Sequence, residues 1–109
     1  MINNKILLFI PCYNCSLHIV NTLKNVKDNI YEMIDEIILV DNGSTDNTVE
    51  IIKKYVKNIN DLKIKLLINK KNYSLGGSHK VAFNYALKNN FDFVITIHGD
   101  NQDFLIQRI

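Results

Sequence analysis

Residues 40–48 read Val-Asp-Asn-Gly-Ser-Thr-Asp-Asn-Thr, and this stretch decides the predicted fold. It closes an apolar run over residues 36–40, which is typical of a buried strand, and opens an apolar pattern at helical spacing over residues 49–59. Gly43 gives the chain freedom for a tight turn, and the hydroxyl and carboxyl side chains after it can cap the helix. The stretch therefore predicts a connection from a strand to a helix.

Asp41 is the last residue of this predicted strand. Open α/β sheets bind ligands at the carboxyl ends of their strands, so an acid at that place is a candidate binding residue. Helix capping accounts for residues 43–45 and the helix dipole for Asp46, but neither needs an acid at position 41. An acid that only stabilises the turn is the alternative interpretation.

The rest of the chain alternates in the same way. Strands are predicted over residues 5–10, 34–41, 62–68 and 91–97, with Pro11 ending the first. Helices are predicted over residues 19–30, capped by Ser16, and over 48–59 and 76–87, and residues 102–109 are predicted to begin a fourth. Because strands and helices alternate without a break, we expect a single α/β domain over residues 1–109. Its four strands should all be parallel, with the first strand central and helices on both faces.

Composition and charge exclude several classes of protein. Hydrophobic residues make up 47% of the chain, which is globular composition, and a formal net charge of +2 is too mild to predict nucleic-acid binding. The apolar runs are shorter than the roughly 20 residues of a membrane span, and no secretory signal is present. We therefore expect a cytoplasmic protein.

Cys12 and Cys15 form a C-x-x-C motif between the first predicted strand and helix. This is the placement of a thioredoxin-like redox pair, and it could also be half of a zinc site, although no second such motif completes one. Thioredoxin-like proteins place a proline opposite the pair, whereas the only proline here, Pro11, directly precedes Cys12. We favour two reduced thiols at a helix start.

Each predicted strand ends in a polar cluster, over residues 11–14, 41–43, 69–77 and 98–102. Parallel strands place these clusters at one edge of the sheet. Together they offer what a nucleotide needs: an aromatic ring for the base, acids, glycines that let the backbone approach closely, and a hard ligand for Mg²⁺ or Mn²⁺.

In their order and spacing, the four clusters resemble glycosyltransferase family 2, inverting enzymes with the Rossmann-like GT-A nucleotide-sugar fold. The matching pieces are IPCYN at 10–14, VDNGSTDNT at 40–48, Asn72 with Gly76-Gly77, and HGDNQ at 98–102. The stretch LGGSHK at 75–80, followed by His98-Gly99-Asp100, resembles the subgroup whose acid motif reads HGD rather than DxD. That subgroup includes relatives of the polyprenyl-phosphate sugar transferases.

The resemblance implies a role for each matching residue. Tyr13 should lie beside the nucleotide base and Asp41 should contact it, while Asp100 should hold Mg²⁺ or Mn²⁺ on the diphosphate. His98, which replaces the first acid of DxD, is a second candidate metal ligand. The remaining residues expected in the nucleotide site are Pro11, Asn14, Asn42, Gly43, Gly76, Gly77 and Lys80.

The resemblance further implies the nucleotide-sugar-binding half of a glycosyltransferase, which takes a sugar from a UDP- or GDP-sugar to a polyprenyl phosphate or a saccharide. A lipid-phosphate acceptor would place the protein at the inner membrane face. Family members continue past the metal motif into the acceptor site and the catalytic base, so we expect a truncated domain that lacks a catalytic base and self-associates through an exposed sheet edge. The alternatives are a non-catalytic nucleotide-binding or interaction module and a C-x-x-C thiol oxidoreductase.

Overall fold

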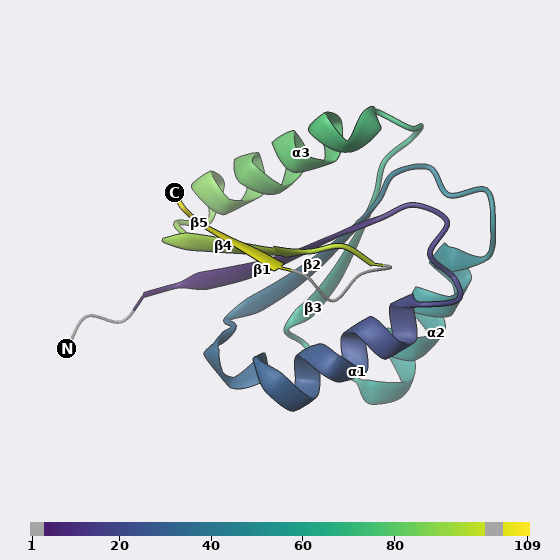
Figure 1. Cartoon of the computed structure of the whole chain (residues 1–109), viewed down its shortest axis with the longest axis horizontal. Helices are drawn as coiled ribbons and strands as arrows, with labels where there is room; N and C mark the ends of the chain where they lie inside the picture. The colour runs from purple at the N-terminus through teal and green to yellow at the C-terminus, as the bar shows by residue number, and fades with distance from the viewer. Residues whose placement is uncertain (1–3, 100–103) are drawn as a thin grey trace.

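Five strands of the described chain form one sheet in the order β3-β2-β1-β4-β5 (Figure 1). The computed structural model describes residues 4–99 and 104–109. The strands are β1 (Ile6–Cys12), β2 (Glu36–Asp41), β3 (Ile64–Ile68), β4 (Phe93–Ile97) and β5 (Phe104–Arg108). The pairs β1–β2, β1–β4 and β2–β3 are parallel, and β1 is central as predicted.

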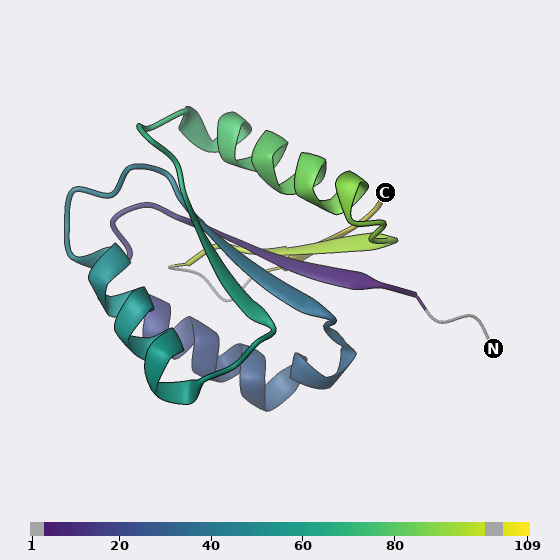
Figure 2. The ribbon, with the colours of Figure 1, turned by 180° about the vertical axis from the view of Figure 1, so that it is seen from behind.

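Helices cover both faces of the sheet, which confirms the predicted three-layer arrangement. The helices are α1 (Ile19–Asn29), α2 (Thr48–Ile59) and α3 (Ser74–Lys88), and a short 3-10 helix (Tyr31–Met33) follows α1. Helices α1 and α2 lie on one face, and α3 lies alone on the other (Figures 1 and 2). No helix in residues 4–99 and 104–109 is long and apolar enough to span a membrane.

Strand β1 shows why this sheet has long apolar runs. Successive side chains of a strand point to opposite faces, and here both faces are covered. Leu8 and Ile10 pack in the cluster that includes α1 and α2, whereas Leu7 and Phe9 pack in the cluster beneath α3. All four side chains are fully buried. The alternation therefore divides one apolar strand between two cores.

Pro11 does not end β1 as predicted, because the strand continues to Cys12. The Pro11 carbonyl accepts a hydrogen bond of 3.1 Å from the Gly99 N–H, so this residue faces β4. The β1–β4 ladder stops at the pair Phe9 and Thr96, two residues earlier. A proline at position 11 therefore removes no backbone hydrogen bond from the β1–β4 ladder, and the strand can continue through it.

The predicted fourth helix over residues 102–109 is wrong: β5 is a strand, antiparallel to β4. It pairs Phe93 with Arg108 and Ile97 with Phe104, and without it the outer backbone groups of β4 would have no ladder partner. The expectation of four strands that are all parallel therefore also fails at this edge. Leu105 and Ile106 of this edge strand are about half exposed.

Helix α2 has the predicted bounds, whereas the predicted cap of α1 is wrong. Ser16 lies outside α1, whose N-terminal flanking residue is His18, with no side-chain cap. Before α2, the Asp46 carboxylate accepts a hydrogen bond of 3.0 Å from the Thr48 N–H. The turn after β2 thus supplies a helix-start acid, as the sequence predicted.

Candidate functional site

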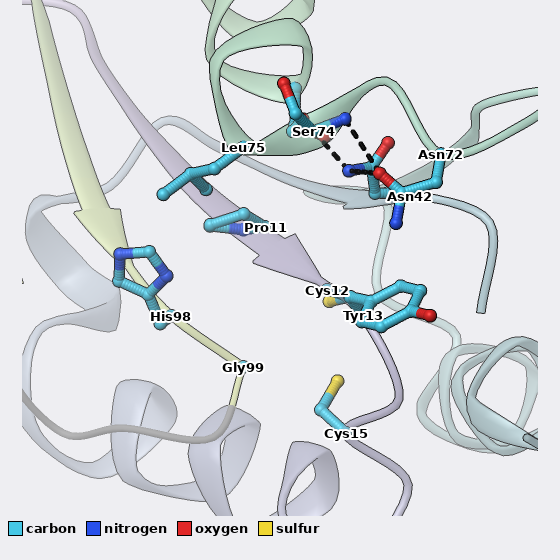
Figure 3. A pocket seen from close by; sticks show the side chains of 11 residues that line it. Pro11, Cys12, Tyr13, Cys15, Asn42, Asn72, Ser74, Leu75, His98 and Gly99 are labelled. Atoms are coloured by element: carbon cyan, nitrogen blue, oxygen red, sulfur yellow. Dashed lines mark hydrogen bonds between the residues drawn. The ribbon is translucent and has the colours of Figure 1, made fainter.

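Three strand ends and the start of α3 surround a pocket of about 340 Å³ (Figure 3). The segments after β1, β2 and β4 meet the β3–α3 connection here, as expected for the carboxyl edge of an open α/β sheet. The pocket is lined by Pro11, Cys12, Tyr13, Cys15, Asn42, Asn72, Ser74, Leu75, Ser78, His98 and Gly99. The Tyr13 and His98 rings stand at opposite ends of it.

The pocket brings together only part of the predicted nucleotide site. Four of the predicted residues line it: Pro11, Tyr13, Asn42 and His98. Six others do not line it: Asn14, Asp41, Gly43, Gly76, Gly77 and Lys80. Asp100, the predicted metal ligand, lies outside the described residues.

Asp41 is buried and stabilises its own turn. One carboxylate oxygen accepts hydrogen bonds from the N–H groups of Gly43 (3.2 Å) and Ser44 (3.1 Å), and the other accepts one of 2.5 Å from the Ser44 hydroxyl. The residue is only 1% exposed. These contacts fix the turn after β2, and this turn places Asn42 in the wall of the pocket.

Asn42 connects three segments at the wall of the pocket. Its side-chain nitrogen donates to Asn72 Oδ1 (3.1 Å) and to the Ser74 carbonyl (3.0 Å), both drawn in Figure 3. Its side-chain oxygen accepts from Asn69 Nδ2 (3.0 Å) and from the Tyr73 N–H (2.9 Å). A single buried amide therefore sets the start of α3 against the end of β2.

Asn14 performs a similar task between the first two strand ends. It has a left-handed backbone conformation with φ of 49°. Its side-chain oxygen accepts hydrogen bonds from the N–H groups of Thr45 (2.8 Å) and Asp46 (3.2 Å), and its own N–H donates to the Ser44 hydroxyl at 3.0 Å. Asn14 thereby joins the loop that carries Tyr13 to the loop that carries Asn42.

The three glycines predicted for the nucleotide site differ in how much space each leaves for a side chain. Gly43 has φ of +80°, and a Cβ there would lie 2.9 Å from the Asn72 backbone nitrogen. In α3, a Cβ on Gly77 would lie 2.4 Å from Tyr73 Cβ, whereas one on Gly76 would meet nothing closer than 3.9 Å. Gly43 and Gly77 therefore allow close packing around the pocket, and Gly76 does not serve that purpose.

His98 is a candidate cation ligand that the structure places in the pocket, where it is half-buried. Residues 4–99 and 104–109 contain no group of three His, Cys, Asp or Glu side chains that could hold a metal ion. Among the described residues, His98 is the one imidazole that lines the pocket, and a complete cation site there would need further ligands.

His79 lies against the ring of Phe9, with ring centroids 5.2 Å apart, and its pKa is lowered from the ordinary 6.5, first by burial and then by the charge of His98. The unfolded chain thus binds a proton more readily than the folded chain does, so stability should fall as the pH drops below about 6.5. We expect the unfolding temperature of the wild type to fall more between pH 7.5 and pH 5.5 than that of His79→Gln. Equal pH dependence of the two proteins would contradict this cause.

Sequence patterns missed most of the α3 wall and the pocket role of the thiols. Ser78 follows Leu75 by three residues and Ser74 by four, which is the spacing of neighbours on a helix surface and could have identified these residues as a group. Cys12, Cys15 and Gly99 contribute because the first loop folds back on the end of β4. No local pattern encodes that contact.

Comparison with known proteins agrees with this geometry. Residues 7–104 match the family described as Glycosyl transferase family 2. The UDP-N-acetylglucosamine–dolichyl-phosphate N-acetylglucosaminyltransferase of Methanococcus voltae is 30% identical over 112 residues, which cover 94% of this chain and 43% of that protein. The chain spans between 27% and 43% of the length of the curated relatives that it matches.

Two solved structures share the fold. Staphylococcus aureus TarS 1-349, in complex with UDP-GlcNAc, superposes with a TM-score of 0.72 at 28% identity, covering 88% of this chain and 26% of that one. The mannosyltransferase PcManGT from Pyrobaculum calidifontis, in complex with GDP-Man and Mn²⁺, has a TM-score of 0.78 at 21% identity, covering 91% and 28%. The predicted α/β GT-A fold is confirmed.

Proposed function

This chain belongs to glycosyl transferase family 2, and on that premise we propose that it forms the nucleotide-sugar-binding part of an inverting glycosyltransferase. The observation that carries the proposal is the pocket at the carboxyl edge of the sheet, where Tyr13, Asn42 and His98 from three separate loops line one cavity. Its volume of about 340 Å³ is within the usual range for small-molecule sites.

The proposed ligand is the nucleoside diphosphate of a UDP- or GDP-sugar. The Tyr13 ring is 49% exposed at one end of the pocket, and an exposed ring there can stack on a base. Asp41 stays a proposed contact of the base, and that contact would share a carboxylate that already accepts three hydrogen bonds. The relative TarS, 28% identical, was crystallised with UDP-GlcNAc, which supports this ligand class.

The other predicted residues have indirect roles in this proposal. Asn14 and Gly43 hold the loops that present Tyr13 and Asn42. Gly77 lets the start of α3 pack closely. Gly76 and Lys80, which do not line the pocket, would meet the ligand only through its ribose or phosphates.

We include a divalent cation, Mg²⁺ or Mn²⁺, held by Asp100 and His98. Mg²⁺ in proteins is commonly held by one or two carboxylates together with substrate phosphates, so this small donor set suits a cation that arrives with a diphosphate. Such a cation would neutralise the departing nucleoside diphosphate. The protein's part is to direct His98 into the pocket from the end of β4.

The acceptor and the catalytic base are not assigned to residues of this chain. Inverting transfer to a hydroxyl acceptor needs a general base that takes its proton, whereas a phosphate acceptor is already anionic at neutral pH. The Methanococcus voltae relative, 30% identical, is named as a transferase that acts with dolichyl phosphate, which supports a polyprenyl phosphate acceptor over a saccharide. A thiol oxidoreductase is less well supported, because Cys12 and Cys15 are each only 2% exposed, which keeps the disulfide of another protein from reaching them.

Isothermal titration calorimetry with UDP and GDP, with and without Mn²⁺, tests the proposal. We expect Tyr13→Ala to weaken binding of the preferred nucleotide by about 5- to 150-fold, since stacking of a base on an aromatic ring is worth about 1–3 kcal/mol. Leu17→Ala is the matched control, because Leu17 lies in the same loop, is 86% exposed and does not line the pocket. The proposal fails if neither nucleotide binds, and the pocket assignment fails if both variants bind alike.

A further inference from the structure

Cys12 and Cys15 meet the same glycine at the wall of the pocket. Cys12 ends β1 and Cys15 lies three residues later, and both side chains are buried and line the pocket. A Cβ on Gly99 would lie 2.8 Å from Cys15 Sγ and 3.4 Å from Cys12 Sγ. The two sulfurs therefore occupy the space that any larger residue at position 99 would need.

The loop between the cysteines brings their sulfurs together. Asn14, inside the motif, has φ of 49°, which turns the chain back so that Cys15 returns toward the end of β1. Figure 3 shows both sulfur atoms turned toward the same space, with Gly99 beside it. Cys12 and Cys15 are both thiols in this structure. Because both sulfurs lie within 3.4 Å of the same point, rotation of the two side chains can bring them together.

We propose that Cys12 and Cys15 are a modification site, at which a hydroperoxide converts the two thiols reversibly into an intrachain disulfide. One thiolate attacks the peroxide, forming a sulfenic acid and releasing hydroxide. The second thiolate then attacks that sulfur, the S–S bond forms, and the hydroxyl group leaves as water. In total, two thiols and hydrogen peroxide give one disulfide and two molecules of water. Hydrogen peroxide is small enough to enter the pocket that both sulfurs line.

The disulfide would act on the pocket through Gly99. This residue is held by two hydrogen bonds, because its N–H donates to the Pro11 carbonyl (3.1 Å) and its carbonyl accepts from the Thr22 hydroxyl (3.0 Å). The two sulfurs fill the space where its Cβ would stand. An S–S bond of about 2.05 Å requires at least one sulfur to move, which changes that packing. Gly99 lies between His98 and Asp100, so oxidation should weaken the binding of a nucleotide with its cation. This consequence, unlike disulfide formation itself, rests on the proposed function.

Intact-mass spectrometry of the native protein, before and after hydrogen peroxide, tests the first step. We expect the loss of two hydrogen atoms, recovery with dithiothreitol, and a peptide in which Cys12 is linked to Cys15. The variants Cys12→Ser and Cys15→Ser should not form the disulfide, and peptide mapping of the wild type decides the point if either variant does not fold. Addition of oxygen atoms without a disulfide, or no reaction at all, would overturn the inference.

Calorimetry with UDP and Mn²⁺ on reduced and oxidised protein tests the second step. We expect oxidation to weaken binding by about tenfold, with recovery on reduction, and no such loss in Cys12→Ser/Cys15→Ser treated in the same way. A disulfide that leaves both the affinity and the unfolding temperature unchanged would overturn the coupling to Gly99. If the reduced protein binds no nucleotide, the proposed function fails, while the mass and the unfolding temperature still decide the inference about the thiols.

Discussion

Replacing Asp41 with alanine is expected to lower the free energy of unfolding by about 3 kcal/mol, because hydrogen bonds to a charged group contribute about 1.5–3 kcal/mol each and are not additive. The change removes a buried carboxylate that accepts from two backbone N–H groups and from the Ser44 hydroxyl. Those donors would be left without their acceptor where water hardly reaches. Urea denaturation followed by circular dichroism measures the change.

Asp46→Ala is the matched control for Asp41→Ala. Asp46 is an acid of the same turn that accepts hydrogen bonds from the Thr48 N–H and hydroxyl, but it is exposed. Water can replace it as the acceptor, so its loss should destabilise the protein clearly less. Asp41→Asn should fall between the two, since it keeps one acceptor oxygen. If Asp41→Ala were no more harmful than Asp46→Ala, the turn would not depend on the buried carboxylate.

Gly43→Ala is expected to cost about 2–4 kcal/mol of stability, since a left-handed residue with a Cβ costs about 1–2 kcal/mol and a backbone clash adds to that. The new Cβ would lie 2.9 Å from the Asn72 nitrogen and 3.1 Å from the Lys71 carbonyl carbon, both of them backbone atoms that side-chain rotation cannot move. The displaced β3–α3 connection carries Asn72 and Ser74 into the pocket, so nucleotide binding should weaken as well.

Gly76→Ala is the matched control, because we expect it to raise the stability that Gly43→Ala lowers. Gly76 lies in α3, and its Cβ would have open space, so the substitution should stabilise the helix by about 0.5–1 kcal/mol. Thermal and urea unfolding of both variants, with UDP titrations, give the comparison. Equal effects of the two substitutions would show that the left-handed turn at Gly43 is not what holds the two loops together.

The order of elements could be predicted from the sequence because each local pattern agreed with its surroundings. The alternation of apolar strands and amphipathic helices predicted the parallel core and the central β1. The turn at residues 40–48 predicted α2 to its first and last residues. The same turn predicted that Gly43 needs unusual backbone freedom, which its φ of +80° confirms. These features depend on neighbours in the chain.

The errors occurred where a distant partner decides the local structure. Residues 104–108 form β5 because β4 offers an open edge, and a short apolar run by itself does not distinguish a strand from a helix. Pro11 continues β1 because the ladder toward β4 has already ended there. In both places the backbone hydrogen bonds of another strand set the outcome.

The sequence alone therefore determined the layers of this protein and the sheet edge at which its polar residues gather, since periodicity and turn residues act over a few positions. Only the tertiary structure decided which of those residues form the pocket. It directed the Asp41 carboxylate into its own turn, joined the loop after β2 to the β3–α3 connection through the Asn42 amide, and packed Cys12 and Cys15 against Gly99. Each of these contacts depends on how the loops and side chains are oriented in the folded chain, and the periodicity of strands and helices does not encode that orientation.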